Sequence, residues 1–118
     1  MKAQRNVLYD SAQRFFDSEG SGLMKLSADA AIRVCLTATS RGLIVARVEG
    51  GIWHHPGFEA RVDCIWDGAD PPIDPTAAEA NNQAAADFIR EECREHDVFV
   101  VTAPPLTGWP HGSSKAPL

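Results

Sequence analysis

The strongest constraint on the fold is the run FEARVDCIWD at 58–67, in which apolar and polar residues alternate and only Ile65 breaks the pattern. A period of two with one polar face indicates a β-strand in a sheet that is covered on one side only. A second strand is predicted over LIVARVE at 43–49. The eight residues between them contain three glycines and a proline and predict a hairpin connection longer than a tight turn. The alternation directs these residues to the core: Phe58, Ala60, Val62, Cys64 and Trp66.

Charges suggest how the two strands pair. If Val48 lies opposite Val62, each neighbouring pair across the ladder combines opposite charges. Such cross-strand pairs each contribute roughly 0.2–1 kcal/mol. The pairs predicted by this register are Arg47 with Asp63 and Glu49 with Arg61.

Three helices are predicted from periodicity and end signals. The first covers 5–18, where apolar residues fall near helical spacing. The second lies within 27–42, with Ser27 as N-cap and Gly42 as a left-handed C-cap. A strand also fits part of this segment, because Ile32 to Ala38 alternate, but the paired start and stop signals favour the helix.

The third helix follows a proline-rich loop at 67–75. Asp74 before Pro75 suits its start, and Thr76 with Glu79 is a capping-box alternative. Its apolar stripe is predicted to be Ala78, Ala85, Phe88, Ile89 and Cys93.

A last strand is predicted over 97–105, before two prolines end it. The order of elements favours a small two-layer α/β sandwich of the α+β class, with about three helices on one face of a three-stranded mixed sheet containing one β-hairpin. The hairpin precedes a strand–helix–strand unit that suits a right-handed crossover. Residues 1–106 form a single domain in this prediction, and 107–118, rich in glycine, proline and serine, form a flexible C-terminal tail.

Charge is unevenly distributed along the 118 residues, whose net charge is -5. Residues 59–97 hold three arginines against eleven carboxylates, a balance of -8. This block repels phosphate backbones, which argues against nucleic acid, and attracts a basic partner. The chain has no secretory signal pattern and no apolar run near the roughly 20 residues of a membrane helix. We therefore expect a cytoplasmic protein.

No catalytic motif emerges from the reactive residues. Three widely spaced cysteines argue for reduced, buried thiols, and alternation separates Cys64 from Asp63. His54 and His55, or Cys93 with His96, are candidate metal ligands, but their spacing matches no common zinc pattern. The expectation is no catalytic residue, no metal and no cofactor; a small metal-dependent or acid/base enzyme using His54, His55 and nearby carboxylates is the alternative.

Trp53 lies in the predicted hairpin tip GGIWHHPG, between glycines and histidines. Tryptophan is typical of interface cores, with charged groups at the rim. An inward-folded Trp53 that covers the end of the sheet is equally consistent with the sequence.

In size, acidity and the hairpin VEGGIWHHPGFEARVDCIWDG, the chain resembles the immunity proteins of bacterial toxin–immunity systems, including contact-dependent growth inhibition and colicin-like pairs. The resemblance implies an inhibitor that occludes the active site of a cognate basic toxin, often a nuclease, without binding nucleic acid or membrane. A homodimer that pairs through its sheet edge is a further option. The residues predicted to contact the partner are Glu49, Trp53, His54, His55, Glu59, Asp67, Asp70 and Asp74.

Overall fold

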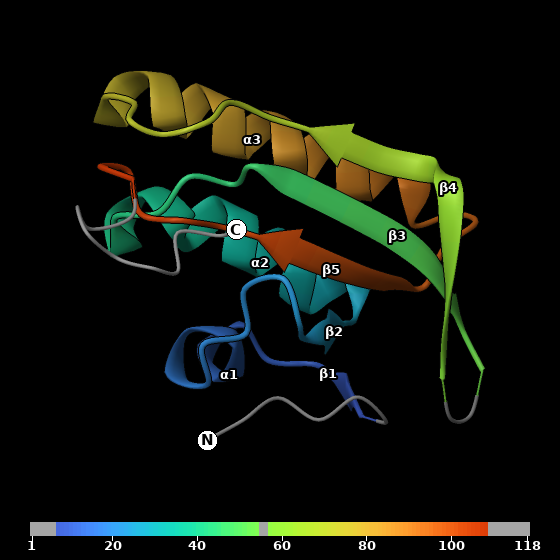
Figure 1. Cartoon of the computed structure of the whole chain (residues 1–118). Coiled ribbons are helices and arrows are strands. Elements are labelled where there is room, and N and C mark those ends of the chain that lie inside the picture. The colour runs from blue at the N-terminus through green and yellow to red at the C-terminus, as the bar shows by residue number, and fades with distance from the viewer. Residues whose placement is uncertain (1–6, 55–56, 109–118) are drawn as a thin grey trace.

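The computed structural model describes residues 7–54 and 57–108, which form an α+β structure around one mixed sheet (Figure 1). The sheet has five strands, against the three predicted, because two very short strands extend it. Strands of two residues have no periodicity of their own, so the sequence does not reveal them. In sheet order the strands are β1 (Leu8–Tyr9), β2 (Lys25–Leu26), β5 (Val98–Thr102), β3 (Arg47–Trp53) and β4 (Phe58–Asp67).

Three α-helices were expected and three are present in the described residues: α1 (Ala12–Asp17), α2 (Ala28–Ala38) and α3 (Pro75–Glu92). The predicted helix at 5–18 is wrong in its first half: the Ser11 side chain accepts a hydrogen bond from the Arg14 amide, and α1 begins after it. The helical interpretation of α2 is confirmed. Ser27 caps it, and a 3₁₀ turn over Thr39–Arg41 ends at Gly42 with a φ of 75°.

α3 begins where the sequence predicts, with Asp74 as N-cap and Pro75 in its first turn. The Asp74 carboxylate accepts a hydrogen bond from the Ala77 amide at 2.9 Å. Most of the predicted stripe faces the core, but Cys93 lies beyond the helix and is exposed. The stripe prediction fails there because the helix ends at Glu92, so the 3.6-residue period no longer applies.

Helices α2 and α3 cover one face of the sheet, as Figure 1 shows. The core lies between these layers and includes Val48, Phe99 and Val101 from the central strands. The opposite face carries Arg47 and Glu49, whose side chains are 43% and 39% exposed. In the described part of the chain no helix is long and apolar enough to cross a membrane.

β5 pairs with β3, and both β4 and β5 run antiparallel to β3. β4 and β5 are therefore parallel, with β3 between them, and α3 connects them across the covered face. Tertiary pairing thus confirms a strand–helix–strand crossover after the hairpin.

The register of the hairpin differs from the prediction. Val48 lies opposite Trp66, not Val62, and Arg47 lies opposite Asp67. The ladder shifts between the Glu49–Ile65 and Gly51–Ala60 pairs, so Gly50 alone faces the four residues 61–64. A bulge of this kind bends a strand and increases its twist.

The bulge depends on the close approach of strand backbones and side chains. A Cβ atom on Gly50 would lie 2.4 Å from Cys64 Sγ, and one on Gly51 would lie 2.1 Å from the Glu59 carbonyl oxygen. Two predictions about the core are wrong: Val62 is 89% exposed and Ala60 is also exposed, whereas Cys64 is fully buried and Phe58 and Trp66 are half-buried. Simple alternation fails because the extra residues change which face each side chain takes.

Candidate partner-binding surface

We call residues 51–54 and 57–63, the outer half of the hairpin with its bulge, the hairpin arm; its tip extends beyond the rest of the sheet. β5 accompanies β3 only as far as the Gly51–Val98 pair, whereas β3 and β4 continue to pair up to Trp53 and Phe58. Figure 1 shows the arm turning sharply, at the right of the view, from the direction of the rest of β4. Lys25 Nζ lies 5.7 Å from the centre of the Phe58 ring, so the arm leans towards β2.

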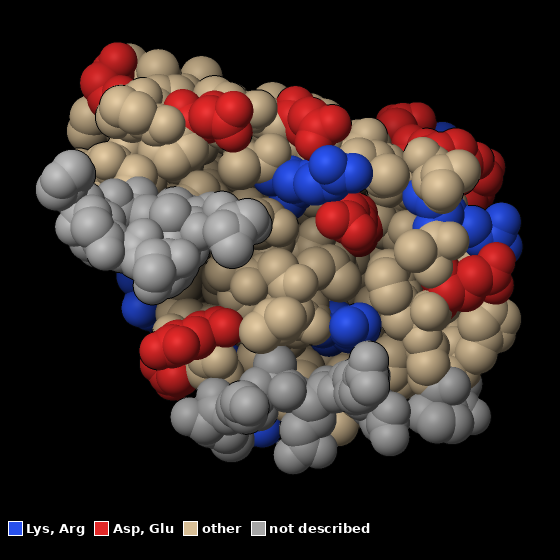
Figure 2. All heavy atoms as spheres, viewed as in Figure 1, with Lys and Arg blue, Asp and Glu red and all other residues tan. Residues whose placement is uncertain are grey.

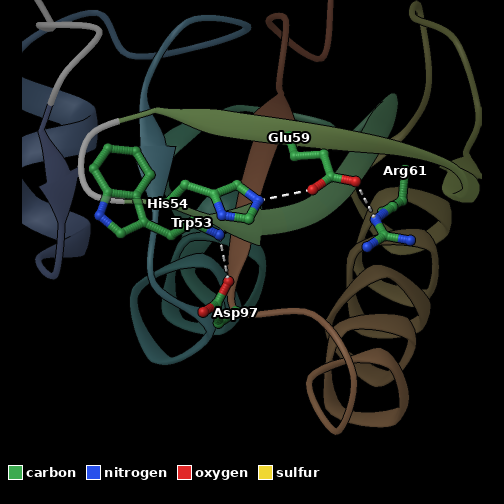
Figure 3. A network of polar contacts seen from close by, with 5 residues as sticks. All are labelled: Trp53, His54, Glu59, Arg61 and Asp97. Carbon is green, nitrogen blue, oxygen red and sulfur yellow. Dashed lines mark hydrogen bonds and ion pairs between the residues drawn. The ribbon is translucent and has the colours of Figure 1, made fainter.

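A polar network connects the arm to the start of β5 (Figure 3). The Trp53 amide donates a hydrogen bond to Asp97 Oδ1 at 2.8 Å. His54 Nε2 lies 2.7 Å from Glu59 Oε1, and Arg61 Nε lies 3.0 Å from Glu59 Oε2. Both carboxylate oxygens of Glu59 are therefore engaged, and the hydrogen bond from His54, followed by the charge of Arg61, lowers the pKa of Glu59.

Apolar groups accompany this network. Trp53 is the last residue of β3 and is half-buried. Its exposure lies between that of an interface residue open to solvent and that of a side chain folded over the end of the sheet, the two interpretations that the sequence left open. Val62 is the most exposed of the large hydrophobic residues in the described chain. Sequence reasoning missed Val62 because alternation placed it in the core, and the only signal was the pair Gly50–Gly51, which permits a bulge.

A second group of charged side chains lies at the other end of the hairpin. We call Arg47, Glu49 and Asp67 the base cluster. Arg47 lies between two carboxylates, with Nε 3.3 Å from Glu49 Oε2 and Nη1 3.4 Å from Asp67 Oδ1. Arg47 therefore pairs with Asp67 and not with Asp63 as predicted. Figure 2 views the molecule from the side of the sheet that α2 and α3 do not cover, and basic side chains lie among acidic ones there.

Asp70 and Asp74 follow the base cluster in the loop before α3, and both are exposed. Asp74 serves as the helix cap, and Asp70 has no ion pair within the described residues. Asn81 holds this loop in place: its Oδ1 accepts a hydrogen bond from the Ala69 amide, and its Nδ2 donates one to the Val45 carbonyl, both at 2.8 Å.

The predicted partner-binding residues thus fall into two groups, not one. Trp53, His54 and Glu59 lie on the arm, while Glu49, Asp67, Asp70 and Asp74 lie at or beyond the base of the hairpin. The two ends of β4 lie opposite the two ends of β3, whose seven residues span about 20 Å at the usual rise per residue. His55 lies outside the described residues.

Comparison with known proteins identifies the family. The model of the family described as "Colicin-E5 Imm protein" matches residues 24–103, about two thirds of the chain. This chain belongs to the colicin-E5 immunity protein family.

Individual relatives agree with that assignment. The chain is 68% identical over 101 residues to "Immunity protein CdiI" of Burkholderia pseudomallei, covering 86% of this chain and 93% of the relative. It is 32% identical over 80 residues to "Colicin-E5 immunity protein" of Escherichia coli, covering 67% of this chain and 96% of that relative. The role of the chain is that of a toxin-immunity protein, which confirms the resemblance inferred from the sequence.

The family match begins at Met24 and includes the arm, the base cluster and α3, but not β1 or α1. The surroundings of the two buried thiols of this immunity protein favour their protonated form. Burial raises the pKa of Cys35 to about 12, and burial together with the Glu92 carboxylate raises that of Cys64 to about 12. Both thiols stay protonated at neutral pH, and the thiolate is the reactive form.

Proposed function

We propose that this protein neutralises a cognate toxin by binding it along the open side of the hairpin, from the arm to the base cluster, and covering the toxin's active site. Family membership supports an inhibitor in place of an enzyme. The observation that carries the location is the arm itself: its tip, with the half-buried Trp53, extends beyond β5, and its bulge presents Val62 at 89% exposure. Apolar and aromatic side chains of this kind form the centre of protein interfaces.

The size of this surface suits one partner. The paired part of the hairpin spans about 20 Å along β3. A standard interface buries about 800 Å² on each partner, a patch roughly 30 Å across. A single toxin domain can therefore contact the arm and the base cluster together, although these lie at opposite ends of β4.

Electrostatics favour a basic toxin, for example a nuclease whose active site attracts phosphate. The segment 59–97 has a balance of -8, and Asp67, Asp70 and Asp74 are all exposed. Complementary charge raises association rates and makes them sensitive to salt. The same charge disfavours nucleic acid as a direct partner, and the proposal places neutralisation in the cytoplasm.

Association kinetics with the cognate toxin test the electrostatic part. The triple change Asp67→Asn, Asp70→Asn and Asp74→Asn removes three charges while keeping a capping residue at 74. We expect the association rate to fall several-fold and its salt dependence to flatten. The control carries an equal charge change on exposed residues of the α1–α2 side: Asp17→Asn, Glu19→Gln and Asp29→Asn. Equal rates for the two triple variants would show that the acidic segment does not guide the toxin.

A matched pair of substitutions tests the arm. Val62→Asp places a charge on the arm, and Leu23→Asp places one on a remote residue that is 62% exposed. We expect the first to raise the dissociation constant at least tenfold, mainly through faster dissociation, and the second to leave it unchanged. Trp53→Ala is expected to weaken binding by more than about 2 kcal/mol, the range of interface anchors. Wild-type affinity in both arm variants would overturn the proposed surface.

Pairing between two copies is a second candidate, favoured by the position of β4 at the edge of the sheet. Exposed edge strands offer unpaired backbone groups to other chains. The mass of the protein in solution at micromolar concentration decides between a dimer and a monomer, and a monomer excludes this candidate without affecting toxin binding.

A further inference from the structure

A third group of ionisable side chains lies behind the hairpin, where β4, the end of α3 and the turn before β5 meet. Cys64, Glu92 and His96 each offer one ligand atom there, and these three atoms lie within 4.8 Å of one another. Cys64 is fully buried, His96 is 8% exposed and Glu92 is partly buried. Neither the arm nor the base cluster includes these residues.

We propose that Cys64, Glu92 and His96 bind a divalent cation with the ligand preference of zinc. Thiolate, imidazole and carboxylate are the three side-chain ligands that zinc uses, with bonds of about 2.0–2.3 Å. Ligand atoms of a tetrahedral zinc site therefore lie about 3.5 Å apart. His96 Nδ1 and Glu92 Oε1 are already 3.3 Å apart, so this pair needs little rearrangement.

The local structure brings the three ligands together for identifiable reasons. Glu92 ends α3 and His96 lies in the turn that follows, where the His96 amide donates a hydrogen bond to the Glu92 carbonyl oxygen at 3.0 Å and so brings the two side chains together. Cys64 reaches them because Gly50 has no side chain: a Cβ there would lie 2.4 Å from Cys64 Sγ. The candidate pair from the sequence, Cys93 with His96, does not form, because Cys93 is exposed and its thiol donates to the Arg90 carbonyl oxygen at 3.3 Å.

Binding requires a simple exchange. The cation takes the place of the proton on Cys64 Sγ, the proton leaves to solvent, and water completes the coordination. The partly exposed Glu92 gives the cation access from solvent. A bound ion would connect β4, α3 and the turn before β5, next to Asp97, which holds the Trp53 amide. The cation would thus stabilise the base of the arm, a role separate from toxin neutralisation.

Titration of chelator-treated protein with Zn²⁺ and Co²⁺ tests the site. We expect one equivalent to bind with a micromolar or lower dissociation constant, and Co²⁺ to give the ultraviolet charge-transfer band of a thiolate ligand. The band should disappear in Cys64→Ser and persist in Cys93→Ser, the matched control with an exposed thiol. No binding at micromolar metal, or a band that persists in Cys64→Ser and disappears in Cys93→Ser, overturns the assignment.

A second pair of variants keeps the test valid if Cys64→Ser does not fold. Glu92→Gln is compared with Glu91→Gln, which changes an exposed neighbour. We expect Glu92→Gln to raise the zinc dissociation constant at least roughly tenfold, since even indirect changes around a metal site cost that much. Zinc should also raise the melting temperature of wild type and Glu91→Gln but not of Glu92→Gln. Equal zinc affinity and equal thermal shifts in the two variants would refute the site.

Discussion

The carboxylate of Asp97 accepts a hydrogen bond from the backbone amide of Trp53 at 2.8 Å, although the two residues lie 44 positions apart. This hydrogen bond attaches the arm to the residue directly before β5. The arm has no other strand beside it at this point, because β5 pairs with β3 only as far as Gly51. The order of the proposed toxin-binding arm therefore depends on a residue that is distant in sequence.

Asp97→Ala is expected to loosen the arm while leaving the core intact. A hydrogen bond to a charged acceptor contributes about 1.5–3 kcal/mol in favourable cases, and less at an exposed site such as this one. Amide hydrogen exchange at Trp53 should accelerate, and toxin affinity should fall. Asp87→Ala, which removes an exposed carboxylate from α3, is the control and should change neither. Unchanged Trp53 exchange in Asp97→Ala would show that the bond does not order the arm.

Asn82 is expected to be the most sensitive polar residue of the core. It is 1% exposed, its Oδ1 accepts a hydrogen bond from the Val45 amide at 2.8 Å, and its Nδ2 donates to the Leu43 carbonyl at 3.1 Å. Asn82→Ala leaves both backbone groups buried without their partner, which costs about 2–4 kcal/mol of unfolding free energy. Denaturant unfolding measures this loss. Gln83→Ala, on an exposed neighbour, should change stability by less than about 0.5 kcal/mol.

Two valines of the hairpin should respond in opposite ways, because the bulge places them in different surroundings. Val48 is fully buried, and Val48→Ala should cost about 2 kcal/mol of unfolding free energy. Val62 is 89% exposed, and Val62→Thr should change stability by less than about 0.5 kcal/mol. Chemical denaturation of both variants checks the register directly. Comparable losses in the two variants would favour the simple alternating hairpin over the bulged one.

Alkaline pH should destabilise the protein through Cys35. Burial raises the folded-state pKa of this thiol from the ordinary value of 9.0 to about 12. The protonated thiol is favoured in the folded state, so its contribution is complete below the unfolded pKa and is lost as pH rises from there towards 12. Between pH 8 and pH 10 the loss is about 1 kcal/mol. Cys35→Ala should remove this part of the pH dependence, whereas Cys93→Ala, which changes an exposed thiol, should retain it.

Local signals in the sequence determined much of the fold. Ser27 and Asp74 mark the starts of α2 and α3 because side-chain caps act within three residues. The limits of β4 are those of the alternating run 58–67. Acidity, size and the hairpin also indicated the family to which the chain belongs.

Long-range pairing decided what the sequence did not. β1 and β2 exist only because other strands align them, and β3 begins at Arg47 where β5 and β4 flank it on both sides. The shift at Gly50 moved Val62 out to solvent.

The proposed metal site shows the same difference between local signals and long-range contacts. Its residues are Cys64, Glu92 and His96. The sequence offered Cys93 as the neighbour of His96, because spacing along a helix is local information. The fold instead brings Cys64 from β4, since the missing side chain of Gly50 leaves room for its sulfur. Helix ends and strand periodicity depend on neighbouring residues, so the sequence determines them. The register of a bulged ladder, and the side chains that it brings together, depend on contacts between residues far apart in the sequence, which form only in the folded chain.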